Sequence, residues 1–71
     1  MANVAIGTVK WFDASKGYGF IKPEEGGQDV FVHVSTVEKA GYTALIEGLR
    51  VRYEVVTSGN GKISAANLRL G

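Results

Sequence analysis

The chain has 71 residues, no cysteine, and eight lysines and arginines against seven aspartates and glutamates. These counts exclude disulfide-stapled domains and thiolate metal sites, and a net charge of +1 is too small for a protein that binds nucleic acid through total charge alone. We expect one domain over residues 1–71 with no metal and no cofactor. Because no apolar run reaches 18 residues, we expect a cytoplasmic protein without a membrane span.

Short runs of β-branched and aromatic residues, punctuated by ten glycines and one proline, predict an all-β chain. The segments 24–28 and 58–61 have the composition of hairpin loops, and the Asn60-Gly61 pair suits positive φ. Ser35 and Glu38 lie at capping-box spacing, which predicts one helical turn. We expect these strands to form a closed barrel and not an open sheet, because closure removes the exposed strand edges that invite aggregation. The predicted strands are residues 4–13, 17–23, 29–33, 49–56 and 62–70.

The first predicted strand departs from strict alternation. Regular alternation would place Val9 and Trp11 on one face, and Lys10 and Phe12 on the other. A β-bulge near Lys10 would instead direct Val9 inward and Trp11 outward. A second interpretation keeps Trp11 inside the barrel as a plug, and the sequence leaves both placements open.

The second and third strands carry rings at every second position within "KGYGFIKPEEGGQDVFVHV", residues 16–34. Side chains two residues apart share a face, so Tyr18 and Phe20 lie together, as do Phe31 and His33. The barrel interior can be filled without these rings, which leaves them as an exposed patch of the kind that usually marks a binding site. The alternative is that they are core residues, as strand aromatics commonly are. The side chains assigned to the interior are Ile6, Val9, Ile21, Val30, Val32, Val34, Val51, Tyr53, Val55, Ile63, Ala65 and Leu68.

The spacing of the rings indicates which ligand they suit. Rings two residues apart stand about 6.6 Å apart, roughly twice the rise of about 3.4 Å between stacked bases in a duplex. Bases that rest on successive rings are therefore unstacked and unpaired, and each contributes about 1 to 3 kcal/mol. We expect Lys10, Lys16 and Lys62 to border the rings and meet phosphates, with Lys22 a weaker candidate.

A catalytic interpretation pairs His33 with Asp29 or Asp13, as in a nuclease. No second base, nucleophile or carboxylate cluster for a metal accompanies this histidine in the sequence. The chain also lacks a phosphate-binding loop of the form GxxxxGK followed by serine or threonine. We therefore expect no enzyme activity.

Four segments form a joint pattern of high specificity: "GTVKWFDASKGYGFI", "DVFVHVS", "AGYTAL" and "EGLRVRYEV". The pattern resembles the bacterial cold-shock proteins and covers essentially the whole chain. The resemblance implies a five-stranded antiparallel Greek-key OB-fold barrel whose RNP1-like (KGYGFI) and RNP2-like (VFVHV) strands bind single-stranded RNA and DNA. Phe12 and Tyr42 enter the site through the resemblance alone. The implied site residues are Lys10, Trp11, Phe12, Lys16, Tyr18, Phe20, Phe31, His33, Tyr42 and Lys62.

Four positions depart from the family pattern. Val34 stands where a further aromatic residue is usual, so one stacking surface is missing. Tyr18 replaces phenylalanine and adds a hydroxyl, Asp13 replaces a common asparagine near the phosphate path, and Ile63 replaces a common proline. We expect weaker binding than that of an archetypal member, by about 1 to 3 kcal/mol if Val34 alone counts.

The function that we expect is that of a monomeric, passive RNA chaperone that affects transcription termination and translation and needs no ATP or obligate protein partner. A protein that binds only the open form of an RNA stabilises that form by about 2.7 kcal/mol when the concentration of free protein is a hundred times Kd. This offsets about two base-stacking steps of roughly 1.4 kcal/mol each. One alternative, an RNA-recognition motif, requires two helices and the opposite order of the RNP strands. Another is a barrel whose aromatic face docks a protein partner.

Overall fold

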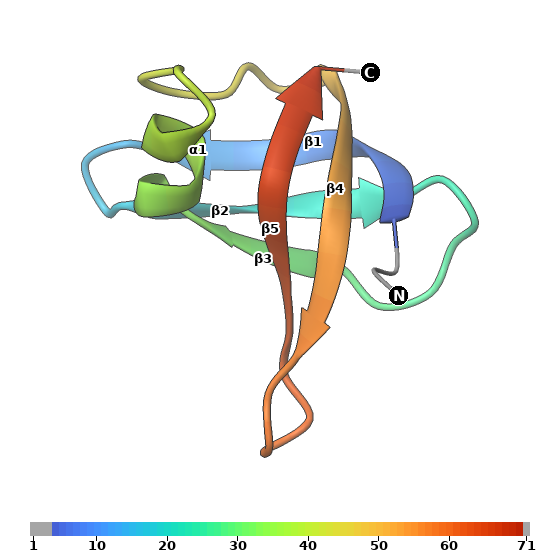
Figure 1. Ribbon diagram of the computed structural model, residues 1–71. Helices are drawn as coiled ribbons and strands as arrows, with labels where there is room; N and C mark the ends of the chain where they lie inside the picture. Colours follow the sequence, from blue (N-terminus) through green and yellow to red (C-terminus); the bar gives the residue numbers. More distant parts are fainter. Residues whose placement is uncertain (1–3, 71) are drawn as a thin grey trace.

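In the computed structural model, which describes residues 4–70, five strands close into a barrel (Figure 1). Their order around the barrel is β1-β2-β3-β5-β4, and β1 pairs with β4 to complete the closure. The all-β fold class and all five predicted strands are confirmed, and no strand limit differs from its prediction by more than one residue. The elements are β1 (Val4–Asp13), β2 (Tyr18–Pro23), β3 (Val30–His33), α1 (Val34–Lys39), β4 (Arg50–Thr57) and β5 (Ile63–Leu70).

The strand directions follow from the connections. Four of the neighbouring pairs are antiparallel, and the fifth, β3 with β5, is parallel. Because β1 is antiparallel to both β2 and β4, and β3 and β5 each run opposite to one of those strands, β3 and β5 must point the same way.

Among the described residues, no helix is long and apolar enough to cross a lipid bilayer.

The bulge predicted in β1 is confirmed. Val9 pairs with Ile21 and Trp11 pairs with Phe20, so Lys10 is the extra residue between two regular pairs. Val9 is 1% exposed, whereas Trp11 is half-buried and packs against rings outside the core. The interpretation of Trp11 as a barrel plug is therefore wrong.

The buried core draws on every strand, on α1 and on the loop that follows it. The eight core residues that lie on strands were all predicted to be interior. Val37 and Leu45 were not predicted, because strand alternation gives no information about a helix or a loop. Val34, predicted to be interior, begins α1 and is half-buried, and Ile63 packs against the core from its edge. Ile6 and Val55 are likewise half-buried. The core residues are Val9, Ile21, Val30, Val32, Val37, Leu45, Val51, Tyr53, Ala65 and Leu68.

Helix α1 starts directly after β3, and its cap differs from the prediction. His33, the last residue of β3, is the N-cap, with extended backbone (φ −89°, ψ 151°) and a side chain that accepts a hydrogen bond from the Ser35 backbone N–H. The predicted capping box with Ser35 as N-cap is wrong because the helix already begins at Val34. One side chain therefore ends a strand and caps a helix.

The Tyr53 side chain, 1% exposed, makes folding sensitive to alkaline pH. Its hydroxyl has no hydrogen-bond partner among the described residues, and burial raises the pKa of Tyr53 above the ordinary 10.0. As the pH rises, the unfolded chain therefore releases this proton before the folded chain does. The contribution of the protonated hydroxyl to stability is complete below about pH 10 and is lost as the pH rises through the pKa of the folded state.

Tyr53→Phe is accordingly expected to unfold less readily than the wild type at alkaline pH. Urea unfolding at about pH 8 and about pH 11 measures the effect, and the other tyrosines are the same in both proteins. If the wild type and the Tyr53→Phe variant lose the same free energy of unfolding when the pH is raised between these two values, the burial of this hydroxyl is contradicted.

Candidate nucleic-acid interface

Five aromatic side chains from three neighbouring strands lie together outside the barrel core. In the register, Tyr18 is opposite His33, Phe20 is opposite Phe31, and Trp11 is opposite Phe20. Neighbouring ring centroids are 5.4 to 6.4 Å apart. We call this set the ring face: Trp11, Tyr18, Phe20, Phe31 and His33.

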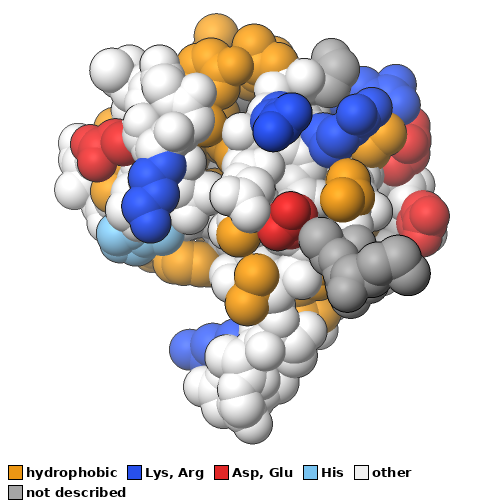
Figure 2. Space-filling model, in the orientation of Figure 1, with side chains coloured by type: hydrophobic (Ala, Val, Ile, Leu, Met, Phe, Trp, Pro, Cys, Tyr) orange, Lys and Arg blue, Asp and Glu red, His pale blue; other side chains and the backbone are white. Residues whose placement is uncertain are grey.

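The rings of the ring face are available to a ligand. His33 is exposed and the other four are half-buried, and none of the five belongs to the core. The interpretation of these rings as core residues is therefore wrong. In Figure 2 the histidine lies at the edge of the visible face with hydrophobic side chains beside it.

The orientations of the rings differ from those of a flat platform. Tyr18 and Phe31 are nearly parallel, at 26°, but Phe20 meets Tyr18 at 89° and Phe31 at 75°. Edge-to-face packing of this kind is favourable between aromatic rings and fixes their tilts. Along each strand the spacing agrees with expectation, at 6.3 Å for Tyr18 and Phe20 and 6.4 Å for Phe31 and His33. The ring face is thus a set of tilted surfaces at the predicted spacing.

Phe12 and Tyr42, which the family resemblance added to the site, are placed differently from the ring face. Both are half-buried and pack against the core, and neither takes part in the ring pairs described above. Phe12 lies opposite Gly19, whose missing side chain leaves room for the Phe12 ring. Tyr42 follows α1, and its backbone N–H donates to the Val37 carbonyl. The structure therefore brings five of the seven predicted rings together.

The contacts of His33 show which ring nitrogen accepts a hydrogen bond. Nδ1 lies 3.1 Å from the Ser35 backbone nitrogen and 2.9 Å from Ser35 Oγ. Since a backbone N–H can only donate, Nδ1 must be the acceptor, and the neutral ring carries its proton on Nε2. The ring thus keeps one N–H donor for an acceptor on a ligand.

The aspartates of the nuclease interpretation are engaged elsewhere. Asp29 pairs with Lys10 at 2.9 Å, and Asp13 Oδ1 accepts the backbone N–H groups of Ser15 and Lys16. The His33 ring hydrogen bonds described above go to Ser35. The histidine–aspartate pair that a nuclease would need is not formed between these residues.

The lysines predicted at the border of the rings are all exposed. Lys10 forms a surface ion pair with Asp29, which the sequence did not reveal because these residues lie on different elements. Such pairs contribute about 0 to 1 kcal/mol, so a phosphate can replace the aspartate. Lys16 lies within the turn that Asp13 holds, and Lys62 directly precedes β5, in the loop between β4 and β5 that extends beyond the barrel in Figure 1.

Two substitutions of His33 should separate its capping role from its ring. His33→Ala is expected to lower the free energy of unfolding by about 1 kcal/mol, because Ser35 N–H loses its acceptor. His33→Asn should restore stability, since asparagine is a good N-cap, while single-strand affinity stays reduced in both variants. Urea unfolding and oligonucleotide titration measure the two effects. Recovery of affinity in the asparagine variant would show that the ring does not contact the ligand.

Comparison with known proteins agrees with this geometry. The family model described as 'Cold-shock' DNA-binding domain matches residues 5–70. The chain is 56% identical to cold shock protein CspA of Rhizobium meliloti, over 89% of this chain and 93% of that protein. It is 52% identical to cold shock-like protein CspE of Escherichia coli K12, over 87% and 88%. It is 47% identical to glycine-rich protein 2 of Nicotiana sylvestris, over 90% of this chain and 30% of that longer protein. The chain therefore belongs to the cold-shock domain family of nucleic-acid-binding proteins.

Proposed function

We propose that this protein binds single-stranded RNA and DNA on the ring face and acts as a passive RNA chaperone in the cytoplasm. The observation that carries the proposal is the set of partly exposed rings from β1, β2 and β3. The ring centroids are 6.3 Å apart along β2 and 6.4 Å apart along β3, well beyond the rise of about 3.4 Å in a duplex. Such spacing suits bases that have separated from their neighbours.

The proposed binding residues divide into two groups by chemistry. The rings supply stacking surfaces, and His33 adds the Nε2 donor that its contacts with Ser35 leave free. Lys10, Lys16 and Lys62 supply positive charge for phosphates. Phe12 and Tyr42 remain proposed contacts on the family resemblance, although their rings pack against the core. We propose a monomer that needs no catalytic step.

The proposed activity is limited by its energetics. Binding of the protein stabilises the open form of an RNA hairpin by about 2.7 kcal/mol when the concentration of free protein is a hundred times Kd, and this offsets about two base-stacking steps. The protein should therefore keep marginal hairpins open and leave long duplexes intact. In this way it would affect transcription termination and translation.

A hairpin-opening assay tests the proposed function. We expect the protein to open a marginally stable RNA hairpin, labelled with a fluorophore and a quencher, in proportion to its concentration and without ATP. A hairpin with a long stem is the control and should stay closed. Binding to single strands without opening of the marginal hairpin would contradict the chaperone role while leaving the binding role standing.

A further inference from the structure

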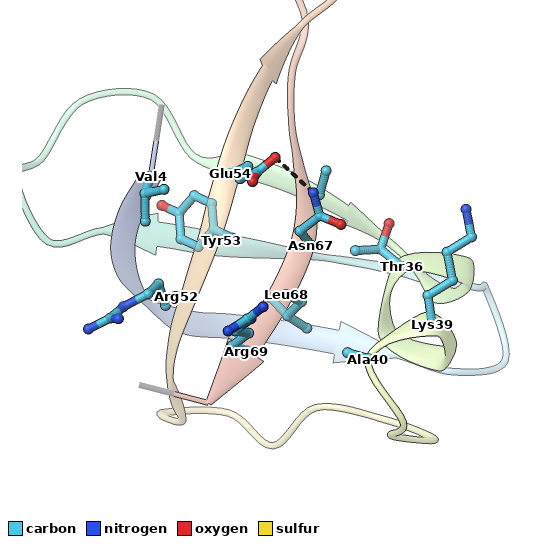
Figure 3. Close-up of a pocket in the computed structure, with 11 residues that line it drawn as sticks. Val4, Thr36, Lys39, Ala40, Arg52, Tyr53, Glu54, Asn67, Leu68 and Arg69 are labelled. Atoms are coloured by element: carbon cyan, nitrogen blue, oxygen red, sulfur yellow. Dashed lines mark hydrogen bonds between the residues drawn. The ribbon is translucent and has the colours of Figure 1, made fainter. Parts of the chain in front are cut away.

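A basic groove lies on a part of the barrel that the ring face does not include. It is bounded by α1 and by β4 and β5, and has a volume of about 850 Å³. Figure 3 shows Lys39 from the end of α1 at one side and Arg52 and Arg69 from the two strands at the other. None of the five rings of the ring face lines it.

The two arginines of the groove are brought together by the strand register. Arg52 is the cross-strand partner of Arg69, so both side chains leave the same side of the β4–β5 hairpin, and both are exposed. Like charges directly opposite each other destabilise a sheet. Within residues 4–70, the ion pairs join Lys10 to Asp29 and Arg50 to Glu24, so neither groove arginine has a carboxylate partner there. A bound anion would relieve this repulsion.

The charge of the groove exceeds that of the whole chain. Three of the eight basic residues line it together with one of the seven acidic residues, whereas the net charge of the chain is +1. The single carboxylate, Glu54, accepts a hydrogen bond from Asn67 Nδ2 at 2.8 Å (Figure 3). Guanidinium groups match phosphate oxygens with two parallel hydrogen bonds. The groove therefore suits a phosphate backbone.

We propose that this groove is a second contact for the phosphate backbone of a long single strand whose bases occupy the ring face. The inference rests on the proposed function, which brings such a polyanion to the protein. The described part of the chain measures 27 × 23 × 20 Å. Rings two residues apart on a β-strand favour a spacing of about 6.6 Å between bases, so about four nucleotides span the longest dimension of the domain. A strand of about twenty nucleotides is long enough to reach both surfaces, whereas one of about four, which at most spans the barrel once, can cover the ring face alone.

The test compares oligo(dT) of about four and about twenty nucleotides on the wild type and on the double variant Arg52→Gln/Arg69→Gln. Three phosphate contacts at the ring face predict a slope of log K against log salt near −2 for the short strand. For the long strand the groove arginines should steepen the slope by about 1.4, and the double variant should lose this increment. At low salt the variant should bind the long strand several-fold more weakly and the short strand unchanged.

Arg50→Gln is the matched control, because it removes the same charge from β4 at a residue that pairs with Glu24 and does not line the groove. Comparison with the single variant Arg69→Gln therefore separates a local contact from an effect of net charge. Equal weakening by these two variants, or an unchanged long-strand slope in the double variant, would overturn the second contact. Failure of the wild type to bind even the short strand would contradict the proposed function itself, and the second contact with it.

Discussion

Phe31→Ala is expected to weaken single-strand binding by about 5- to 150-fold, the equivalent of about 1 to 3 kcal/mol of base stacking. Phe31 is central to the ring face, with its centroid 5.6 Å from that of Tyr18 and 5.9 Å from that of Phe20. Because it lies outside the buried core, the variant should fold, with a loss of stability of about 1 kcal/mol from the ring contacts. Anisotropy of a labelled oligonucleotide and urea unfolding measure the two quantities.

Two further substitutions show what the Phe31 ring contributes. Phe31→Leu keeps an apolar side chain of similar reach but removes the ring, so it should bind as weakly as the alanine variant. Ile46→Ala truncates a side chain that is 74% exposed in the loop after α1, and it should leave binding and stability unchanged. Full affinity in the leucine variant would show that apolar contact, and not stacking, holds the bases. Unfolding of the alanine variant would show that Phe31 belongs to the core.

Gly19→Ala is expected to destabilise the fold by about 1 to 3 kcal/mol or more, a large part of the stability of a small domain. A Cβ at Gly19 would lie 2.7 Å from Phe12 Cα and 2.8 Å from a carbon of the Phe12 ring. The neighbouring backbone of β1 cannot move away without disturbing its pairing with β2. Since this pair carries Trp11 and Tyr18, single-strand affinity should fall as well.

Gly59→Ala provides the matched control for this substitution. Apart from Gly59 itself and its two chain neighbours, no residue has an atom within 4 Å of a Cβ built at Gly59, and its φ is outside the left-handed region. We expect its free energy of unfolding to stay within about 0.5 kcal/mol of the wild type. If urea unfolding shows the two alanine variants to be equally stable, the close packing of β1 on Gly19 is wrong.

The sequence predicted the parts of the fold that depend on local periodicity. Side chains two residues apart share a face of a strand, so the positions of Tyr18 and Phe20 followed from spacing alone. The interruption of this pattern around Lys10 indicated the bulge that turns Val9 inward and Trp11 outward. Enough aliphatic side chains remained to fill the interior, which placed the rings outside it.

Other features depend on contacts between distant residues and were not predictable in this way. The pairing of Lys10 with Asp29 joins residues 19 positions apart and requires the path of the chain between them. The cap of α1 by His33 arises because the helix begins one residue after the strand, which periodicity does not show. The opposition of Arg52 and Arg69 depends on a register that shifts between Arg52 and Glu54. The tilts of the rings result from their mutual packing.

Titration with a single strand and with its matched duplex, followed by the fluorescence of the sole tryptophan, Trp11, tests the central claim most directly. Trp11 lies 5.4 Å from Phe20 and 5.5 Å from Tyr18, so a base stacked on the ring face should quench it. We predict saturable quenching by the single strand and little change with the duplex at equal nucleotide concentration. Equal binding of both forms, or a single strand that leaves the fluorescence unchanged, would contradict the recognition of unpaired bases by these rings.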